Sequence, residues 1–333
     1  MRSTGRVTIG DVARTAGVSV ATVSKVINGR YGVAPETSRH VQQVIDDLGY
    51  ESSIVARSLR SSKTNVIGIL VAEFEPFSTE LLKGISEAVD GTGYELLAYS
   101  GGLRRDDRVG WEQRSLSRLG GTLIDGAILV TPTVVARGSS IPVVAVDPHR
   151  GPSDPPTVDS DNLAGGRTAT QHLLDLGHRR IGFLAGRPDL ESARLREQGY
   201  REALADAGIA FDPDLVRVGG YRPDLADSPA HELLSLPERP TAIFAANDLS
   251  AIRTMEVAAE LGLRVPDDVS VIGFDNVPES ALTTPPLTTV DQPIHRMGTE
   301  ALRLIVDLVE GRTRDPHVRL PTTLVVRGTT RTV

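Results

Sequence analysis

Residues 7–28 read VTIGDVARTAGVSVATVSKVIN, and this pattern predicts two short helices joined by a tight turn. Thr8 stands three residues before Asp11, which is the spacing of a capping box, and apolar side chains recur after it at helical intervals. Gly17 is placed to supply the left-handed residue of the turn. Ser19 then offers a hydroxyl that can cap the second helix. The stretch therefore predicts a helix-turn-helix.

The second predicted helix has an inward and an outward face. Val23, Val26 and Ile27 fall on the inward face. The outward and N-terminal side chains, which can reach a DNA major groove, are Ser19, Val20, Ala21, Thr22, Ser24 and Lys25. Because Val20 and Ala21 are small and apolar, we expect them to distinguish bases through thymine methyl groups and DNA shape.

A third helix is predicted after this pair and would complete a small headpiece. Pro35 stands at a first-turn position and opens it, and Gly49 closes it. We place the headpiece at residues 1–51. Further DNA contacts in it are expected from Thr8, Asn28 and Thr37.

Charge and composition limit the classes of protein to consider. The 333 residues carry a net charge of −7, yet residues 1–64 hold nine Lys and Arg against five Asp and Glu, a net +4 that leaves −11 for the remainder. The basic end suits DNA phosphates. The chain has no cysteine, which excludes disulfides, thiolate zinc sites and a cysteine nucleophile. Because there is no signal-peptide segment and no membrane-length apolar run, we expect a soluble cytoplasmic protein.

The helix-turn-helix of residues 7–28 resembles the N-terminal headpiece of the LacI/GalR family of bacterial transcriptional regulators. The shared pattern consists of Thr, Asp-Val-Ala, Ala-Gly-Val-Ser and Thr-Val-Ser, all within residues 8–24. The resemblance implies a transcription factor that binds a palindromic double-stranded DNA operator, most simply as a repressor. Two-fold half-sites require two headpieces, so a homodimer is expected.

Residues 52–64 form a predicted hinge helix or linker between the headpiece and the rest of the chain. Four apolar side chains give it a short amphipathic helix of two turns, which would be marginal in water by itself. The family resemblance implies that Ala56 and Leu59 contact the minor groove, with Leu59 wedged into the central base step. Many relatives have Pro-Asn where this chain has Ser52 and Ser53, so the geometry at the start of this helix stays open.

From residue 65 onward, short β-branched runs alternate with longer helical stretches. Such alternation predicts an α/β fold with two doubly wound parallel sheets, each with helices on both faces. The arrangement resembles the family's effector domain, which is similar to periplasmic sugar-binding proteins. We predict a first lobe at 65–160 plus 291–321 and a second lobe at 161–290 plus 322–333.

Ligands in such folds bind at the carboxyl ends of parallel strands, here between the two lobes. The candidates that follow strand ends in the first lobe are Glu73, Phe77, Ser78, Ser100, Asp147 and His149. The candidates in the second lobe are Arg194, Tyr221, Asn247 and Asp275.

The resemblance implies roles for several of these residues. An arginine at the place of Arg194 directs its guanidinium into the cleft, and an aspartate at the place of Asp275 contacts effectors. Phe77 and Tyr221 match positions where relatives stack an aromatic ring on the ligand. Asp248 is expected to cap the helix that follows it, which leaves Asn247 as the ligand-binding residue.

Carboxylates, amides, one guanidinium and aromatic rings suit a neutral polyol, so a mono- or oligosaccharide is the first choice of effector. The alternative is a purine or nucleoside acting as a corepressor. The resemblance also implies that relatives that bind purines have polar side chains four and six residues before the Arg194 position, where this chain has Leu190 and Pro188, and this departure disfavours a purine. Glu73 and Glu75 would repel anions such as sugar phosphates, although nearby arginines partly restore the balance.

Other functions are less consistent with the sequence. The acid Asp147 near His149 invites a catalytic or metal-binding interpretation, but no third ligand and no recognisable nucleophile accompanies them. A nucleotide-dependent enzyme rests on fold analogy alone, because no Gly-rich phosphate loop follows a strand. An exported solute-binding protein would need a signal peptide and no basic headpiece. We therefore predict a regulator with no enzymatic activity, no cofactor and no bound metal.

Overall fold

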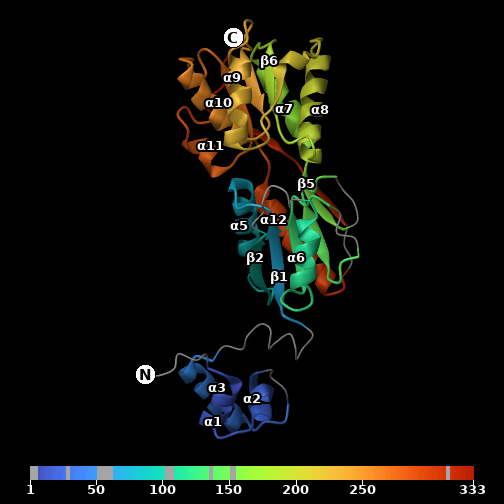
Figure 1. Ribbon diagram of the computed structural model, residues 1–333, viewed down its shortest axis with the longest axis vertical. Helices are drawn as coiled ribbons and strands as arrows, with labels where there is room; N and C mark the ends of the chain where they lie inside the picture. Colours follow the sequence, from blue (N-terminus) through green and yellow to red (C-terminus); the bar gives the residue numbers. More distant parts are fainter. Residues whose placement is uncertain are drawn as a thin grey trace. The chain divides into compact units, whose positions relative to one another are not determined.

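The computed structural model describes residues 7–27, 31–50, 63–101, 109–134, 138–150, 155–312 and 316–333. These residues form two compact units whose boundary lies between Thr64 and Asn65 (Figure 1). The predicted two-turn hinge helix falls outside the described residues. No helix in the described ranges is both long and apolar enough to span a membrane.

The first unit has the predicted helix-turn-helix followed by a third helix. Its helices are α1 (Ile9–Thr15), α2 (Val20–Ile27) and α3 (Pro35–Leu48). The capping box is confirmed: the Asp11 amide donates to Thr8 Oγ1 at 3.3 Å, and the Thr8 amide donates to Asp11 Oδ2 at 2.9 Å. The turn residue Gly17 has a φ of 65°, as the left-handed prediction required. The unit packs around a core that includes Val12, Val23 and Val41.

The first sheet of the second unit is entirely parallel, in the order β11-β5-β4-β3-β1-β2. Its strands are β1 (Val66–Val71), β2 (Glu95–Ser100), β3 (Gly126–Val130), β4 (Val143–Val146), β5 (Thr157–Ser160) and β11 (His317–Leu320). Helices α5 (Pro76–Ala88) and α12 (Ile294–Val309) pack together on one face, and α6 (Trp111–Leu119) lies over the other (Figure 1). The core between the sheet and the paired helices contains Ile67, Leu81 and Ile305.

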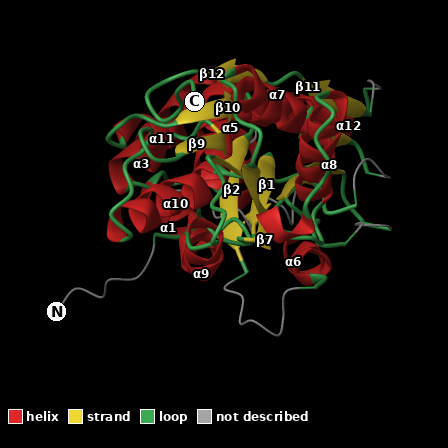
Figure 2. Ribbon diagram, turned by 90° about the horizontal axis from the view of Figure 1, so that it is seen from above, coloured by secondary structure: helices red, strands yellow, loops and turns green. Residues whose placement is uncertain are grey.

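The second sheet has the order β12-β10-β9-β8-β6-β7, and its edge strand β12 runs antiparallel to β10. The strands are β6 (Ile181–Ala185), β7 (Val216–Val218), β8 (Ala242–Ala245), β9 (Ser270–Asp275), β10 (Thr288–Asp291) and β12 (Thr323–Val325). Its two faces are covered by the pairs α7 (Asn162–Asp175) with α8 (Glu191–Asp206) and α9 (Pro223–Leu234) with α10 (Asp248–Glu260). Figure 2 shows helices, in red, flanking the strands. Two short helices, the 3-10 helix Pro213–Leu215 and α11 (Pro278–Leu282), lie in connections.

The chain passes between the two lobes three times: from β5 to α7, from β10 to α12, and from β11 to β12. In each sheet the strand order reverses next to the first strand, at β1 and β3 in one lobe and at β6 and β8 in the other. Such reversals open a crevice at the carboxyl ends of the strands. The predicted α/β architecture is confirmed. Strands β5 and β11 were not expected, because four-residue runs that mix apolar and polar side chains give no clear pattern.

Candidate functional site

The outward face of α2 holds the side chains predicted to contact DNA. Val20, Ala21 and Lys25 are exposed, whereas Thr22 and Ser24 are half-buried. Val23 of the same helix is fully buried, so the predicted division into two faces holds at these positions. A helix with small side chains near its N-terminus and a lysine one turn later is suited to the major groove.

Other predicted DNA-contacting residues also serve as helix caps. The Thr22 amide donates to Ser19 Oγ at 3.1 Å, so Ser19 caps α2. Thr8 belongs to the capping box of α1, and Thr37 is half-buried in the first turn of α3. Three further predicted contacts lie outside the described residues: Asn28, Ala56 and Leu59.

A cavity of about 500 Å³ lies between the two lobes of the second unit, at the carboxyl ends of their strands. The first lobe lines it with Val71, Ala72, Glu73, Glu75, Phe77, Ser78, Trp111, Val130, Thr131, Thr133, Asp147 and His149. The second lobe and the crossing after β10 line it with Arg187, Leu190, Ser192, Arg196, Gly220, Tyr221, Arg222, Pro223, Asp224, Leu225, Asn247, Leu249, Asp275 and Gln292. Open α/β sheets bind ligands at this position.

Four of the residues that line the cavity have strained backbone. The φ angles are 46° at Thr131, 47° at Asp147, 68° at Tyr221 and 114° at Asp275, in the region that residues other than glycine rarely adopt. Such conformations cost about 1–3 kcal/mol each and persist where the surrounding structure fixes them. Two of these residues come from each lobe, so both lobes hold cavity residues in backbone conformations that are unfavourable by themselves.

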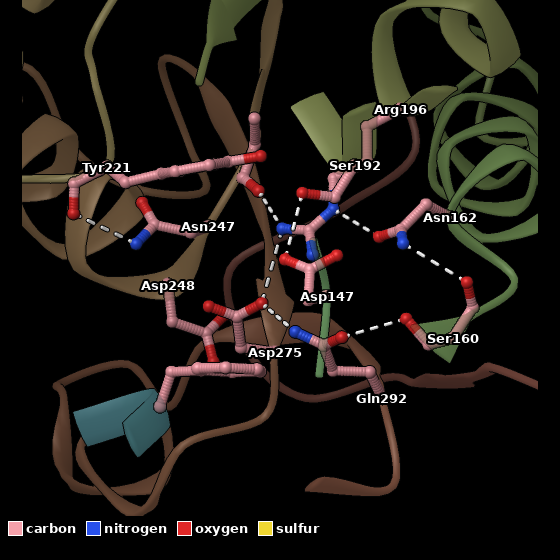
Figure 3. A network of polar contacts seen from close by, with 12 residues as sticks. Asp147, Ser160, Asn162, Ser192, Arg196, Tyr221, Asn247, Asp248, Asp275 and Gln292 are labelled. Carbon is pink, nitrogen blue, oxygen red and sulfur yellow. Dashed lines mark hydrogen bonds and ion pairs between the residues drawn. The ribbon is translucent and has the colours of Figure 1, made fainter. Parts of the chain in front are cut away.

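Arg196 of α8 is at the centre of a polar network (Figure 3). Its Nε donates to Asn162 Oδ1 at 2.8 Å, and its Nη1 donates to the Ala246 carbonyl at 2.6 Å and to Asp275 Oδ1 at 3.2 Å. The guanidinium carbon lies 3.7 Å from the centre of the Phe274 ring, and the side chain is only 4% exposed. Its Nη2 donates to none of the described residues. The network therefore holds the guanidinium in place, while its Nη2 N–H groups remain available to a ligand.

Two carboxyl groups approach Arg196 from opposite lobes. Asp275, at the end of β9, also accepts a hydrogen bond from Gln292 Nε2 at 2.6 Å, and burial raises its pKa while Arg196 opposes the rise. Asp147, which follows β4, accepts from Ser192 Oγ at 3.0 Å. Burial raises the pKa of Asp147 to about 6, again against the attraction of Arg196. The polar end of the cavity thus combines one buried cation with two carboxyl groups that resist ionisation.

Asn247 takes the capping role that the sequence predicted for Asp248. Asn247 is the N-cap of α10: its Oδ1 accepts from the Ser250 amide at 3.1 Å, and its Nδ2 donates to the Tyr221 carbonyl at 3.1 Å. Asp248 is fully buried and accepts from Thr289 Oγ1 at 2.5 Å and from a backbone amide that follows β9. The predicted cap at Asp248 is wrong, because this carboxylate ties α10 to the neighbouring strands. Asn247 borders the cavity while it serves as the cap.

The Tyr221 ring forms part of the second-lobe wall. The Arg196 guanidinium lies 5.5 Å from the centre of this ring. Burial raises the pKa of Tyr221 to about 12, so its hydroxyl stays protonated, and that hydroxyl has no hydrogen-bond partner among the described residues. Gly186 makes room for the ring, since a Cβ there would overlap it. Tyr221 therefore offers a buried aromatic surface with an unused O–H.

The start of α5 supplies much of the first-lobe wall. The Glu75 carboxylate caps this helix, accepting from the amides of Phe77 at 3.0 Å and Ser78 at 2.9 Å, and burial raises the pKa of Glu75. Ser78 is itself buried and donates to the Glu73 carbonyl at 2.8 Å. Glu73 pairs with Arg222 of the second lobe at 2.9 Å. Of this group, the Phe77 ring borders the cavity without being needed for the cap.

His149 is a buried part of the first-lobe wall. Burial and the nearby Arg187 lower the pKa of His149 to about 4, so the ring is neutral near pH 7. Its Nδ1 lies 3.2 Å from Asp189 Oδ2. Across the described ranges, no three His, Asp or Glu side chains gather as a metal site would require. His149 is therefore a neutral polar group at the cavity.

Two predicted site residues are not part of the cavity, and the first is Arg194. Its side chain is half exposed and pairs with Glu191, and it donates from Nη1 to the Pro188 carbonyl at 3.2 Å and from Nη2 to the His149 carbonyl at 3.4 Å. Arg196, two residues later, lines the cavity, as the sequence predicted for Arg194. Two residues along a helix turn the side chain by more than a right angle, so only one of the two arginines can face the cleft.

Ser100 is the second predicted site residue that is not part of the cavity. Its Oγ donates to the Ala72 carbonyl at 3.1 Å, and it does not line the cavity. Strand β2 is at the edge of the first sheet, beyond β1, so its carboxyl end is displaced from the crevice where the strand order reverses.

Comparisons with known proteins agree over almost the whole chain. Residues 8–53 match the family described as bacterial regulatory proteins, lacI family, and residues 170–330 match a periplasmic binding protein-like domain. The HTH-type transcriptional repressor PurR of Photobacterium profundum is 35% identical over 93% of this chain and 94% of its own length. The HTH-type transcriptional regulator CelR of Thermobifida fusca is 36% identical over 97% of this chain and 98% of its own length. The chain belongs to the lacI family.

Solved structures of LacI-family proteins agree with this assignment. A lac repressor dimer bound to operator and the anti-inducer ONPF has a TM-score of 0.85 and 28% identity, over 98% of this chain and 100% of that one. A complex of CelR with cellobiose has a TM-score of 0.72 and 34% identity, over 97% of this chain and 100% of that one. The protein is a DNA-binding transcriptional regulator, and its relatives are regulators, not enzymes.

Sequence reasoning missed many residues of this LacI-family cavity, among them Trp111, Thr131, Ser192, Arg196 and Gln292. A signal for Arg196 was present, because it falls on the buried stripe of α8 with Ala193, Tyr200 and Ala203, where a charged side chain needs a partner. The strand-end rule, applied to β10, would also have found Gln292. No sequence signal marked the left-handed backbone of Thr131.

Proposed function

We propose that this chain is a homodimeric repressor whose affinity for a palindromic operator is controlled by a saccharide bound between the two lobes. The proposal rests mainly on one observation, the buried Arg196 whose Nη2 donors are unused beside the cavity. A fixed guanidinium with adjacent carboxyl oxygens suits pairs of neighbouring hydroxyl groups. The helix-turn-helix on the basic end supplies the DNA-binding half of the proposal.

The charge of the cavity supports a neutral ligand. Acidic side chains outnumber basic ones in its lining, with Glu73, Glu75, Asp147, Asp224 and Asp275 against Arg187, Arg196 and Arg222. Burial raises the pKa of Glu75, Asp147 and Asp275, so these carboxyl groups favour the hydroxyl groups of a neutral ligand, which can both donate and accept, over an anion, which can only accept. Aromatic rings at Phe77, Trp111 and Tyr221 add apolar surface for the C–H face of a sugar.

The relatives support both the saccharide and the dimer. One structural neighbour is a complex of CelR with cellobiose, and another is a lac repressor dimer bound to operator. In our proposal, the saccharide binds one arrangement of the lobes more tightly than the other and so lowers operator affinity. A ligand can shift this equilibrium only by its difference in affinity for the two arrangements.

A purine or nucleoside corepressor is the second candidate, and two observations favour it. PurR is among the most similar relatives. With the cleft arginine corrected to Arg196, the residue four positions before it is the polar Ser192, which also lines the cavity. The residue six positions before it is the apolar Leu190, so one of the two polar positions is filled.

A gel-shift titration of the full chain on palindromes near its gene tests DNA binding. We expect retardation that weakens steeply with salt, because phosphate contacts release counterions. Lys25→Gln should weaken binding, while Lys83→Gln on α5 of the second unit should not. Retardation by no palindrome, or equal retardation by any sequence, would contradict the proposal.

A thermal-shift screen identifies the class of effector. A ligand that binds the folded state stabilises it by RT ln(1 + [L]/Kd), so saturating saccharide should raise the melting temperature. The same saccharide should release the operator in the gel shift. Stabilisation by hypoxanthine or guanine, together with tighter operator binding, would instead establish the purine alternative.

A further inference from the structure

Trp111 is the first residue of α6 and the only tryptophan in the chain. Its side chain borders the cavity and is 2% exposed. The indole Nε1–H is buried and has no hydrogen-bond partner among the described residues. Indole N–H groups usually find a partner when buried, and one left unpaired opposes folding. This donor is therefore available to a ligand that reaches it.

The position of Trp111 is fixed by a network of its own. The neighbouring Glu112 is fully buried and accepts from the amide of Thr133 at 2.5 Å and from its Oγ1 at 3.1 Å. The Gly110 amide donates to Thr133 Oγ1 at 3.0 Å. These bonds tie the start of α6 to the segment that follows β3, which also lines the cavity. The indole is thus held in place by both residues that flank it.

Trp111 is separate from the polar network around Arg196. The residues that bond to Arg196 come from the second lobe, whereas Trp111 and Thr133 belong to the first. No hydrogen bond joins these two groups within the described residues. A cavity of about 500 Å³ also falls in the range of roughly 300–1,000 Å³ that accommodates drug-sized ligands, which are larger than one hexose.

We propose that Trp111 forms a second subsite, so that the effector is an oligosaccharide of more than one ring. One ring binds at Arg196 and Asp275. The next ring packs against the indole, whose N–H donates to a hydroxyl or glycosidic oxygen of that ring. This inference rests on the proposed saccharide effector, and the following experiment separates the failure of one from the failure of the other.

Because Trp111 is the only tryptophan, the emission of the full chain reports on this subsite directly. We would titrate the protein with cellobiose, maltose, lactose, trehalose, glucose and galactose, and follow tryptophan emission and melting temperature in parallel. We expect at least one disaccharide to change both signals and to bind at least about tenfold tighter than its component monosaccharide.

Variants test whether the contact determines this preference. Trp111→Phe keeps a ring but removes the N–H, and Trp111→Ala removes both. We expect losses of about 3-fold and 10-fold or more in disaccharide affinity, with less than about 2-fold change for the monosaccharide. Phe244→Leu is the matched control, because Phe244 is a fully buried ring in the second-lobe core and does not line the cavity. It should lower the melting temperature and leave the preference unchanged.

The outcomes separate the two proposals. A saccharide that raises the melting temperature without changing tryptophan emission would overturn the second subsite and leave the saccharide effector standing. So would Trp111 variants that weaken mono- and disaccharides equally, since a purely structural role predicts that result. A panel in which no saccharide stabilises the protein would overturn both.

Discussion

The two lobes use their polar side chains differently at the cavity. In the second lobe, Arg196 donates to both Asn162 and Asp275, so the cation that borders the cavity is held by polar side chains of its own lobe. In the first lobe, Glu75 and Glu112 use their carboxylates on nearby backbone amides, and the polar groups serve local structure. The second lobe is thus organised for a ligand, while the first lobe positions the walls that enclose it.

This difference predicts a division of roles. Groups held in place in advance lose little freedom on binding, so the second lobe should determine whether the effector binds. The first lobe should determine the size of the ligand that binds.

Replacing Arg196 by Met should abolish the effector response. The substitution removes the cation and leaves the buried Asp275 without its charged partner, and breaking a buried pair in this way costs about 3–5 kcal/mol. We expect effector affinity to fall by at least about 100-fold, and the melting temperature to fall as well. Isothermal titration with the effector found in the thermal-shift screen measures the first change.

Arg194→Met is the matched control, one half-turn away on the same helix. Arg194 is half exposed and paired with Glu191, so its loss should change affinity by less than about 2-fold. The double variant Arg196→Met with Asp275→Asn removes the unpaired charge and should recover stability but not binding. Recovery of binding, or a larger loss from Arg194→Met, would contradict the assigned role of the second lobe.

The same pair of arginines shows what sequence could and could not predict. The headpiece was predictable because its signals are local: the capping box at Thr8 and the left-handed Gly17 depend on residues within one or two turns. The lobes were predictable from periodicity. The choice between Arg194 and Arg196 depends on which face of α8 packs against α7, where Gly166 lets the backbone of Arg196 approach.

The rule that ligands bind at the carboxyl ends of parallel strands also predicted most, but not all, of the candidate residues correctly. It placed eight of ten predicted effector residues at the cavity and failed at Ser100, because strand order, which decides which ends meet, cannot be read from one strand. It also could not assign roles. The cap was assigned to Asp248 instead of Asn247, because a single sequence does not reveal that Asp248 accepts a hydrogen bond from Thr289, forty-one residues later.

A second prediction concerns Asp147, a first-lobe carboxyl group that accepts a hydrogen bond from Ser192 of the second lobe. Burial raises its pKa to about 6 in the folded chain, against the ordinary 3.8. The folded state then holds the proton over a range where the unfolded state has lost it, so this group's contribution to stability falls as pH rises from about 4 to about 6. Asp147→Asn cannot ionise and can still accept from Ser192.

We therefore expect Asp147→Asn to be more stable than the parent above pH 6, by up to about 3 kcal/mol, with a difference that shrinks toward pH 4. Melting temperatures of both proteins from pH 4.5 to 8 test this. A difference that stays constant or reverses its sign with pH would mean that Asp147 is not held neutral by its position.

The smallest effect is expected at the ion pair that joins the lobes at the cavity lining. Glu73 and Arg222 lie 2.9 Å apart, but their side chains are 45% and 44% exposed, and Arg222 also bonds to Asp224 at 3.0 Å. Exposed pairs of this kind contribute about 0–1 kcal/mol and are screened by salt.

A double-mutant cycle with Glu73→Gln and Arg222→Gln should give a coupling energy below about 1 kcal/mol for effector affinity in low salt. That coupling should vanish at about 1 M salt, where the Debye length is only about 3 Å. A coupling above about 2 kcal/mol that survives high salt would mean that the first lobe holds the ligand in place as firmly as the second, and the division between the lobes would fail.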